Sequence, residues 1–263
     1  AAVRRADLPR GASVSVRAVA AREWRALLLT PFGWGCLAVF EFIAAWLFLV
    51  QLDAYARALP RLAAAPTGPG VTDLVIAPLF AQGAILLLLV VPLVTMRLVS
   101  GERQAGTLNL LFSAPLGSAR LVLGKFLGAW LFGLLLLALL ALLPGALLLA
   151  GVVLDLGKLL AGLLGSLLLL TLLTAVGLLL SSYAAQPAGA AVGSFGLLLL
   201  LWVADFGDSG TGGGALGWLS LSAHFKPFLA GLVETGHVAY FLLLSAFCLL
   251  LAVRRVERLR DPV

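Results

Sequence analysis

Charged residues are scarce in this chain of 263 residues and make up 11% of the total. Soluble domains usually carry about 25% charged and roughly 45–50% apolar residues, whereas 62% of the residues here are hydrophobic. These figures exclude an ordinary soluble enzyme. They also exclude intrinsic disorder, since disordered segments are poor in apolar residues. The composition predicts an integral membrane protein.

Motifs for catalysis are also missing. Gly124-Lys125 lacks the upstream glycine of a phosphate-binding loop and is followed by Phe126, so nucleotide hydrolysis by that route is excluded. The two cysteines and the two histidines, His224 and His237, have no metal-ligand spacing. We expect both histidines to be interfacial side chains. We also expect a chain that is not an enzyme and that binds no metal or cofactor itself.

Six apolar segments approach the length of about 20 residues that a helix needs to cross a bilayer core of about 30 Å. They predict an all-α polytopic membrane protein. Residues 32–263 would form one domain of six transmembrane helices, preceded by the N-terminal segment 1–31. The expected spans are 32–52, 74–96, 126–150, 159–180, 184–204 and 236–253.

Basic residues are distributed unequally between the two sides of these spans. Fourteen of the 18 Lys and Arg residues fall in the segment 1–31, the loop 97–125 and the tail 254–263. Because cytoplasmic loops are enriched in basic residues, we expect both termini in the cytoplasm. The net charge of +6 then reflects membrane orientation, and we expect no nucleic-acid partner.

The segment 205–235 is expected on the extracytoplasmic side. It begins glycine-rich and then turns apolar, but Lys226-Pro227 interrupts the apolar stretch. That stretch is too short to span a bilayer. We predict a re-entrant or interfacial helical segment before the last span.

Glu41 is the single clear ionisable residue inside a span. An isolated buried acid costs on the order of 3 kcal/mol, so Glu41 either lines a polar path between subunits or is satisfied by a neighbouring helix. Glycines at four-residue spacing, Gly124/Gly128 and Gly189/Gly193, would let helices approach closely. Such spacing also arises by chance among 29 glycines. We keep Gly189 and Gly193 as a candidate subunit contact.

Two cytoplasmic segments mix charged and apolar residues. Residues 100–107 form a charged, glycine-punctuated turn before a short apolar run. This pattern predicts a short surface helix that exposes Glu102 and Arg103 to a soluble partner, although a solvated connector has the same pattern. Arg22 and Glu23 lie among apolar residues just before the first span, which predicts an interfacial elbow helix.

Several of these motifs resemble those of ABC exporter permeases of the six-span type, in particular the gliding-motility permeases and their relatives in nitrous-oxide-reductase maturation. The most distinctive motif is Pro92–Arg97 leading into Glu102-x-x-x-Gly106-Thr107. The others are Ala21–Arg25, Ser113–Leu116, Gly124-Lys125, an outer segment from Leu219 to Phe241, and a basic tail at Arg254–Arg258. Relatives often carry two adjacent acids in the loop, and here Gly101 stands in place of the first.

The resemblance implies a half-transporter in the inner membrane of a prokaryote. Two permeases, identical or related, would form a dimer, and a coupling helix at about 101–112 in each would dock one of two ATPase subunits. ATP and Mg would be bound by the ATPase. The implied coupling residues are Glu102, Arg103, Gly106 and Thr107, with the elbow residues Arg22 and Glu23 as second choices. In this family, spans one, two and five line the path, which makes Glu41 a candidate path residue.

Two other functions fit the sequence. A mechanical or scaffold subunit would act through residues 205–235 on an extracytoplasmic accessory protein without moving a solute. An ion-coupled carrier would need Glu41 to titrate with transport and would need no ATPase. Membrane lipid surrounds the chain in each case, and no motif identifies a substrate.

Overall fold

A computed structural model describes residues 15–62, 70–107, 117–204 and 218–260. Helices and short turns account for these ranges, and no strand occurs within them. The elements, in chain order, are α1 (Val16–Leu29), α2 (Pro31–Leu62), the π-helix η1 (Thr72–Ile76), α3 (Ala77–Thr95), α4 (Ser100–Gln104), α6 (Ser118–Leu149), α7 (Leu156–Tyr183), α8 (Pro187–Val203), α10 (Leu221–Leu229) and α11 (Thr235–Arg260). The expected all-α fold is confirmed.

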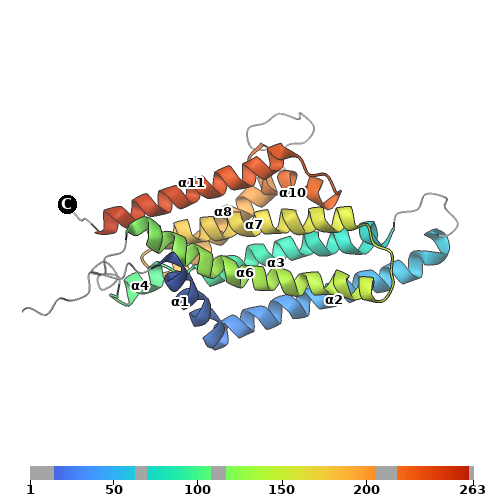
Figure 1. The fold of residues 1–263 in the computed structure, drawn as a ribbon, viewed down its shortest axis with the longest axis horizontal. Coiled ribbons are helices and arrows are strands. Elements are labelled where there is room, and N and C mark those ends of the chain that lie inside the picture. Colours follow the sequence, from blue (N-terminus) through green and yellow to red (C-terminus); the bar gives the residue numbers. More distant parts are fainter. Residues whose placement is uncertain (1–14, 63–69, 108–116, 205–217, 261–263) are drawn as a thin grey trace, which may run out of the picture.

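The long helices run side by side and form an elongated bundle (Figure 1). The helices α1 and α4 and the end of α11 lie at one end, which we call the basic end because of their arginines. The helix α10 lies toward the opposite, outer end (Figure 1). The elements expected on one side of a membrane are therefore found at one end of the bundle.

Five helical segments are long and apolar enough to cross a membrane. Four of them are α2, α6, α7 and α11, and the fifth is the stretch Thr72–Gln104, which contains α3. The sixth expected span corresponds to α8, which is apolar and has 17 residues. This length matches the lower limit of about 17 residues for a spanning helix. The set of six expected spans is thus found as helices.

Three helices extend well beyond the apolar segments that predicted them. The helix α2 continues past residue 52 to Leu62, α6 begins at Ser118, and α11 continues to Arg260. Polar residues support such extensions, as where Arg57 pairs with Asp53 one turn earlier at 2.6 Å. Hydropathy locates the part of a helix that can cross a bilayer, whereas capping and local ion pairs decide where the helix ends.

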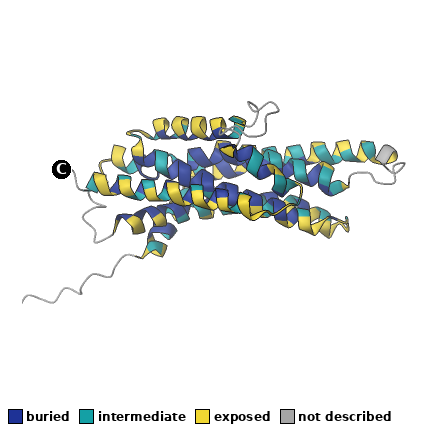
Figure 2. Cartoon of the chain, turned by 90° about the horizontal axis from the view of Figure 1, so that it is seen from above, coloured by how far each residue is buried: buried dark blue, intermediate teal, exposed yellow. Residues whose placement is uncertain are grey.

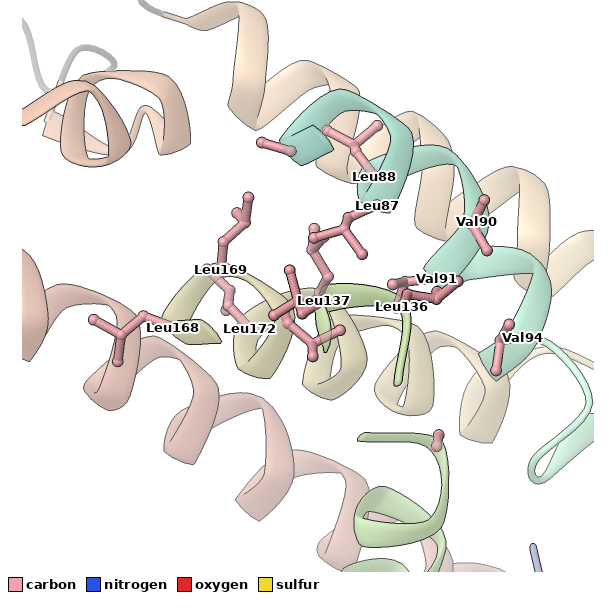
Figure 3. Close-up of a cluster of buried hydrophobic side chains, with 14 of the residues drawn as sticks. Leu87, Leu88, Val90, Val91, Val94, Leu136, Leu137, Leu168, Leu169 and Leu172 are labelled. Carbon is pink, nitrogen blue, oxygen red and sulfur yellow. The ribbon is translucent and has the colours of Figure 1, made fainter. Parts of the chain in front are cut away.

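The helix α7 is the central element. In the most apolar 18-residue stretch of α7, 67% is buried, whereas the figure for the corresponding stretch of α2 is 22%. The helix α7 contacts α3, α6, α8, α10 and α11. Figure 2 shows buried residues along the middle of the bundle and exposed ones on its outer faces. Figure 3 shows aliphatic side chains of α3, α6 and α7 meeting there, among them Leu87, Leu136 and Leu169. A helix that is apolar on all sides is one that neighbours surround.

The outer helix α10 lies within the expected re-entrant segment. Its buried residues, Leu221, Ser222, Phe225 and Phe228, pack it against the bundle, and α7 and α8 both contact it. Residues 205–217 of the expected segment lie outside the described residues. A helical segment before the last span is confirmed, and its depth in a membrane stays a prediction.

The helices α3 and α7 approach each other closely near the basic end. A Cβ at Gly177 would lie 2.1 Å from Thr95 Oγ1 and 2.8 Å from Thr95 Cβ. Thr95 is fully buried and donates its hydroxyl to the Val91 carbonyl at 2.9 Å. Any side chain at position 177 would therefore push the two helices apart. Small residues at such contacts are the usual basis of helix packing in membranes.

We expect Gly177→Ala to lower the free energy of unfolding by about 1–3 kcal/mol, the usual cost of overpacking a core. The matched control is Gly145→Ala in α6, because no atom lies within 4 Å of a Cβ at Gly145. The stability of both variants is measured by heating the detergent-solubilised protein and monitoring its unfolding by size-exclusion chromatography. Equal transition temperatures for the two variants would show that this close contact is unimportant.

Candidate functional site

The candidate site lies at the basic end, where α1, α4 and α6 meet (Figure 1). The elbow helix α1 is capped by Ser15, whose hydroxyl accepts from the Ala18 N–H at 3.3 Å. It ends at Leu29 with Thr30 as its C-cap, and Pro31 begins α2. The expected helix before the first span is confirmed, while its place at a membrane interface stays a prediction.

Two glycines of α6 let α1 pack directly on it. A Cβ at Gly124 would lie 2.6 Å from Val19 Cβ, and one at Gly128 would lie 2.6 Å from Glu23 Cβ. The close approach expected from the Gly124/Gly128 spacing therefore occurs, and it joins two helices of the same chain. It brings Glu23 beside the start of the third span.

Four charged side chains form an ion network between these helices. Lys125 Nζ lies 2.9 Å from Glu23 Oε1 and 2.7 Å from Glu102 Oε1. Arg22 Nη2 bridges the same two oxygens at 2.9 and 3.0 Å. Two acids and two bases, drawn from α1, α4 and α6, thus neutralise one another. We call these four residues the ion network.

Lys125 is the dominant member of the ion network. Its side chain is 2% exposed, whereas that of Arg22 is 54% exposed. Exposed ion pairs contribute only about 0–1 kcal/mol because water screens them, but a buried ammonium must be compensated or it is strongly destabilising. Glu23 and Glu102 provide that compensation, so Lys125 requires both α1 and α4 to be in place.

The charges also shift the pKa values of the elbow residues. Burial raises the pKa of Glu23, but attraction to Lys125 and hydrogen bonds from Lys125 and Arg22 outweigh it and lower that pKa below its ordinary 4.5. The hydrogen bond to Glu23 raises the pKa of Arg22. Glu23 therefore stabilises the fold fully above about pH 4.5, and this contribution is lost as the pH falls below that value.

A second anchor holds α4 from the side of α7. Ser181 Oγ accepts from the N–H groups of Val99 and Ser100 at 3.1 and 3.2 Å, and it donates to the Met96 carbonyl at 2.9 Å. The first N–H groups of a helix lack partners within the helix, and no side chain of α4 caps them. Ser181, which is fully buried, supplies the cap from another helix.

The four expected coupling residues divide into two groups. Glu102 is half-buried and faces the ion network, which corrects the expectation that it is exposed to a partner. Its Oε2 is buried and has no hydrogen-bond partner among the described residues. Arg103, Gly106 and Thr107 are exposed. Gly106 has φ +68° and Thr107 N–H donates to the Glu102 carbonyl at 3.0 Å, so these residues close a turn after α4.

The remaining sequence candidates lie elsewhere. Glu41 is half-buried on α2, and its Oε2 has no hydrogen-bond partner in the described part of the chain. Farther along the contact between α2 and α3, Gln51 donates to Gln82. Gly189 and Gly193 are exposed on α8, where a Cβ at Gly189 would meet no atom within 4 Å. The apolar part of the expected coupling helix, 108–112, lies outside the described residues.

Sequence reasoning missed two residues of this site. Lys125 entered the sequence analysis as a loop base and as part of the Gly124-Lys125 motif, without a role in the site, although a lysine directly before an apolar span signals that a buried partner is required. Ser181 carries no signal of its own, because serine is common at helix ends. Its role depends on how α3 and α7 are aligned, which hydropathy does not reveal.

The histidines form a second polar cluster at the outer end. His224 Nδ1 lies 2.7 Å from His237 Nδ1, and His224 Nε2 lies 2.9 Å from the Trp218 carbonyl. That carbonyl can only accept, so His224 Nε2 carries a proton, and when His224 is neutral its Nδ1 accepts from His237 Nδ1. The other nitrogen of His237 lies 3.4 Å from Glu234 Oε2. Among the described residues no group of three possible metal ligands occurs, and the pair joins α10 to α11.

We expect Lys125→Met to lower the free energy of unfolding by about 3 kcal/mol, because it leaves two carboxylates facing each other without their buried cation. Arg22→Met should cost less than about 1 kcal/mol, since that side chain is half exposed. Replacing Lys125, Glu23 and Glu102 together by Met, Gln and Gln should recover stability. Chemical or thermal unfolding near neutral pH measures all three. If Arg22→Met proves as damaging as Lys125→Met, the dominant role of Lys125 is wrong.

The histidine pair predicts a pH dependence. Burial lowers the pKa of His224 and the charge of His237 lowers it further, while the hydrogen bond to the Trp218 carbonyl opposes both. A lowered pKa means that this contact stabilises the fold fully above about pH 6.5 and is lost as the pH falls below that value. The stability difference between wild type and His224→Phe, measured well above and well below pH 6.5, should shrink at the lower pH. A constant difference would refute the assignment.

Comparison with known proteins identifies the family. Residues 17–205 match the ABC-2 family transporter protein, a range that runs from α1 to the end of α8 and covers well over half of the chain. No curated protein matches the chain significantly. Apolar helices of spanning length and this match together describe an integral membrane protein. The chain belongs to the ABC-2 transporter family and is the permease subunit of an ABC transporter, the kind that works with an ABC ATPase subunit.

Proposed function

We propose that this chain is the transmembrane half of an ATP-driven exporter. Two permeases form a dimer, and each docks one copy of a separate ATPase that holds ATP and Mg. The observation that carries the proposal is the way in which α4 is held in the bundle. This short helix exposes Arg103, and it is held on one side by the ion pairs of the ion network and on the other by hydrogen bonds to Ser181.

The two anchors give α4 a way to transmit movement. A helix of five residues has no stability of its own, so its position is set by the groups that hold it. An ATPase that displaces α4 would pull α1 and α6 through Lys125 and α7 through Ser181. Because packed cores switch between discrete arrangements and do not deform continuously, such a pull favours a change between inward-open and outward-open states.

Other parts of the chain have proposed places in this assembly. The unequal distribution of basic residues supports an inner-membrane protein with both termini in the cytoplasm. The exposed Gly189/Gly193 face of α8 is a candidate contact with the second permease, and Glu41 is a candidate path residue. The outer end around α10 would meet an extracytoplasmic accessory protein. The branch of gliding-motility and nitrous-oxide-reductase maturation permeases remains the proposed position within the family.

The buried oxygen of Glu41 has no partner among the described residues, and this observation favours an ion-coupled carrier, a candidate that ranks below the mechanical or scaffold subunit and that the family match disfavours. In that case Glu41→Gln would abolish transport and no ATPase would be needed. In an exporter the same variant would still bind the ATPase. The two candidates therefore differ in whether a protein with a phosphate-binding loop accompanies the chain.

We expect a tagged chain, purified from native membranes in mild detergent with a non-hydrolysed nucleotide, to bring along a protein with a phosphate-binding loop in equal amount. Arg103→Glu should reduce this recovery at least about tenfold, in line with losing one charge-assisted contact. Arg17→Glu is the matched control, because Arg17 is an exposed arginine of α1 outside the ion network. Absence of any ATPase from the wild-type preparation would contradict the proposal, and equal loss in both variants would contradict the docking surface.

A further inference from the structure

A cavity of about 480 Å³ opens at the basic end, between the turn that joins α3 to α4 and the turn that joins α7 to α8. Its lining includes Arg97, Gly101, Gln104 and Gln186, together with the first residues of α8. Small-molecule sites typically have volumes of about 300–1,000 Å³. The cavity is therefore large enough for a small ligand or for the head group of a larger one.

Among the residues that the structure describes, Arg97 is the only charged one in the lining. Its guanidinium carbon lies 5.4 Å from the centre of the Phe32 ring, so the ring supports one face of the cation. Arg97 forms no ion pair with any residue that the structure describes. Glu23 shares a smaller cavity with Arg97, but Lys125 and Arg22 already hold the Glu23 carboxylate. The charge of Arg97 is thus available to an external anion.

Neutral residues complete the lining next to this cation. Gln104 and Gln186 are exposed amides that can donate hydrogen bonds to an oxyanion. A Cβ at Gly101 would lie 3.3 Å from Arg97 Cβ, so any side chain at position 101 would stand directly beside Arg97. Glycine there provides neither a counter-ion nor bulk, and the cation remains open toward the cavity.

We propose that this cavity is an entry site for cargo that carries an oxyanion, such as a carboxylate or phosphate group, with Arg97 as its principal ligand. An arginine fork binds such groups in bidentate geometry, and the two amides would provide further hydrogen bonds. The inference rests on the proposed exporter function. It adds a substrate class to that function. The cavity opens at the end where α4 would dock the ATPase, and it is lined by the turn after α3 and by the first residues of α8.

The position of Gly101 allows a sharp test. Arg97→Gln removes the cation, whereas Gly101→Glu keeps it and places a carboxylate beside it. Gly101→Gln is the matched control, because it adds nearly the same bulk without charge. Thermal stability of the purified permease–ATPase complex is measured with increasing inorganic phosphate against chloride at equal ionic strength. It is also measured in bilayer discs of phosphatidylglycerol against phosphatidylcholine.

We expect phosphate or phosphatidylglycerol to stabilise the wild-type complex. The apparent affinity for the anion should fall at least about tenfold in both Arg97→Gln and Gly101→Glu, and it should be unchanged in Gly101→Gln. A response to phosphate indicates soluble anionic cargo, and a response to phosphatidylglycerol alone indicates an anionic lipid. Equal anion responses in all four proteins would overturn the proposal, since the ions then bind elsewhere.

Recovery of the ATPase with each variant separates this inference from the proposed function. Arg97→Gln should retain the ATPase. If it loses the ATPase and keeps the anion response, Arg97 belongs to the docking surface and the entry site is refuted while the exporter stands. If no variant and no wild-type preparation contains an ATPase, the exporter fails, and the anion response of the chain alone still decides whether the cavity binds an oxyanion.

Discussion

The buried ammonium group of Lys125 determines how the basic end of this bundle is assembled. A lysine whose side chain is 2% exposed is tolerated only with carboxylates around it, and those come from α1 and α4. The elbow helix, the short helix α4 and the long helix α6 are therefore held by one electrostatic requirement. The glycines of α6 that admit α1 serve the same end, because they bring Glu23 within reach of Lys125.

The central helix α7 extends this arrangement through the bundle. Its basic end caps α4 through Ser181, and its length contacts α3, α6, α8 and α11 before it reaches α10. A displacement at α4 would therefore act on a single continuous helix, which contacts most of the other helices of the bundle. In the proposed exporter, this connection is the route by which a movement of the partner ATPase reaches the rest of the bundle.

Much of the fold could be predicted from the sequence, because a bilayer demands long apolar helices and leaves them visible in hydropathy. The elbow was predictable as well, since Arg22 and Glu23 lie in an amphipathic segment that Pro31 ends. The pairings could not be predicted. Which carboxylates reach Lys125, and which N–H groups Ser181 caps, depend on the rotation and register of helices that are far apart in sequence.

The same limit explains one placement that differed from expectation and one pairing that the sequence did not reveal. Glu102 stands in a charged loop, so the sequence favours exposure, yet α4 turns it inward because Lys125 needs a second acid. His224 and His237 are thirteen residues apart and look like separate interfacial side chains. Packing of α10 onto α11 makes them hydrogen-bond partners. In both cases the local sequence pattern reflects a residue's neighbours along the chain and does not reveal its contacts with helices that are distant in sequence.

We expect the ion network to make α1 and α4 move together. This expectation is tested by distances between spin labels at Arg17→Cys and Ala105→Cys, in a background where the buried Cys36 and Cys248 are replaced by alanine. The permease–ATPase complex is measured without nucleotide and after trapping with ATP and vanadate. We predict a narrow distance within each permease, between α1 and the residue after α4, that is unchanged by nucleotide, and a broad, nucleotide-dependent distribution of that intrachain distance once Lys125→Met is added. A nucleotide-dependent change of similar size with and without Lys125 would contradict the account.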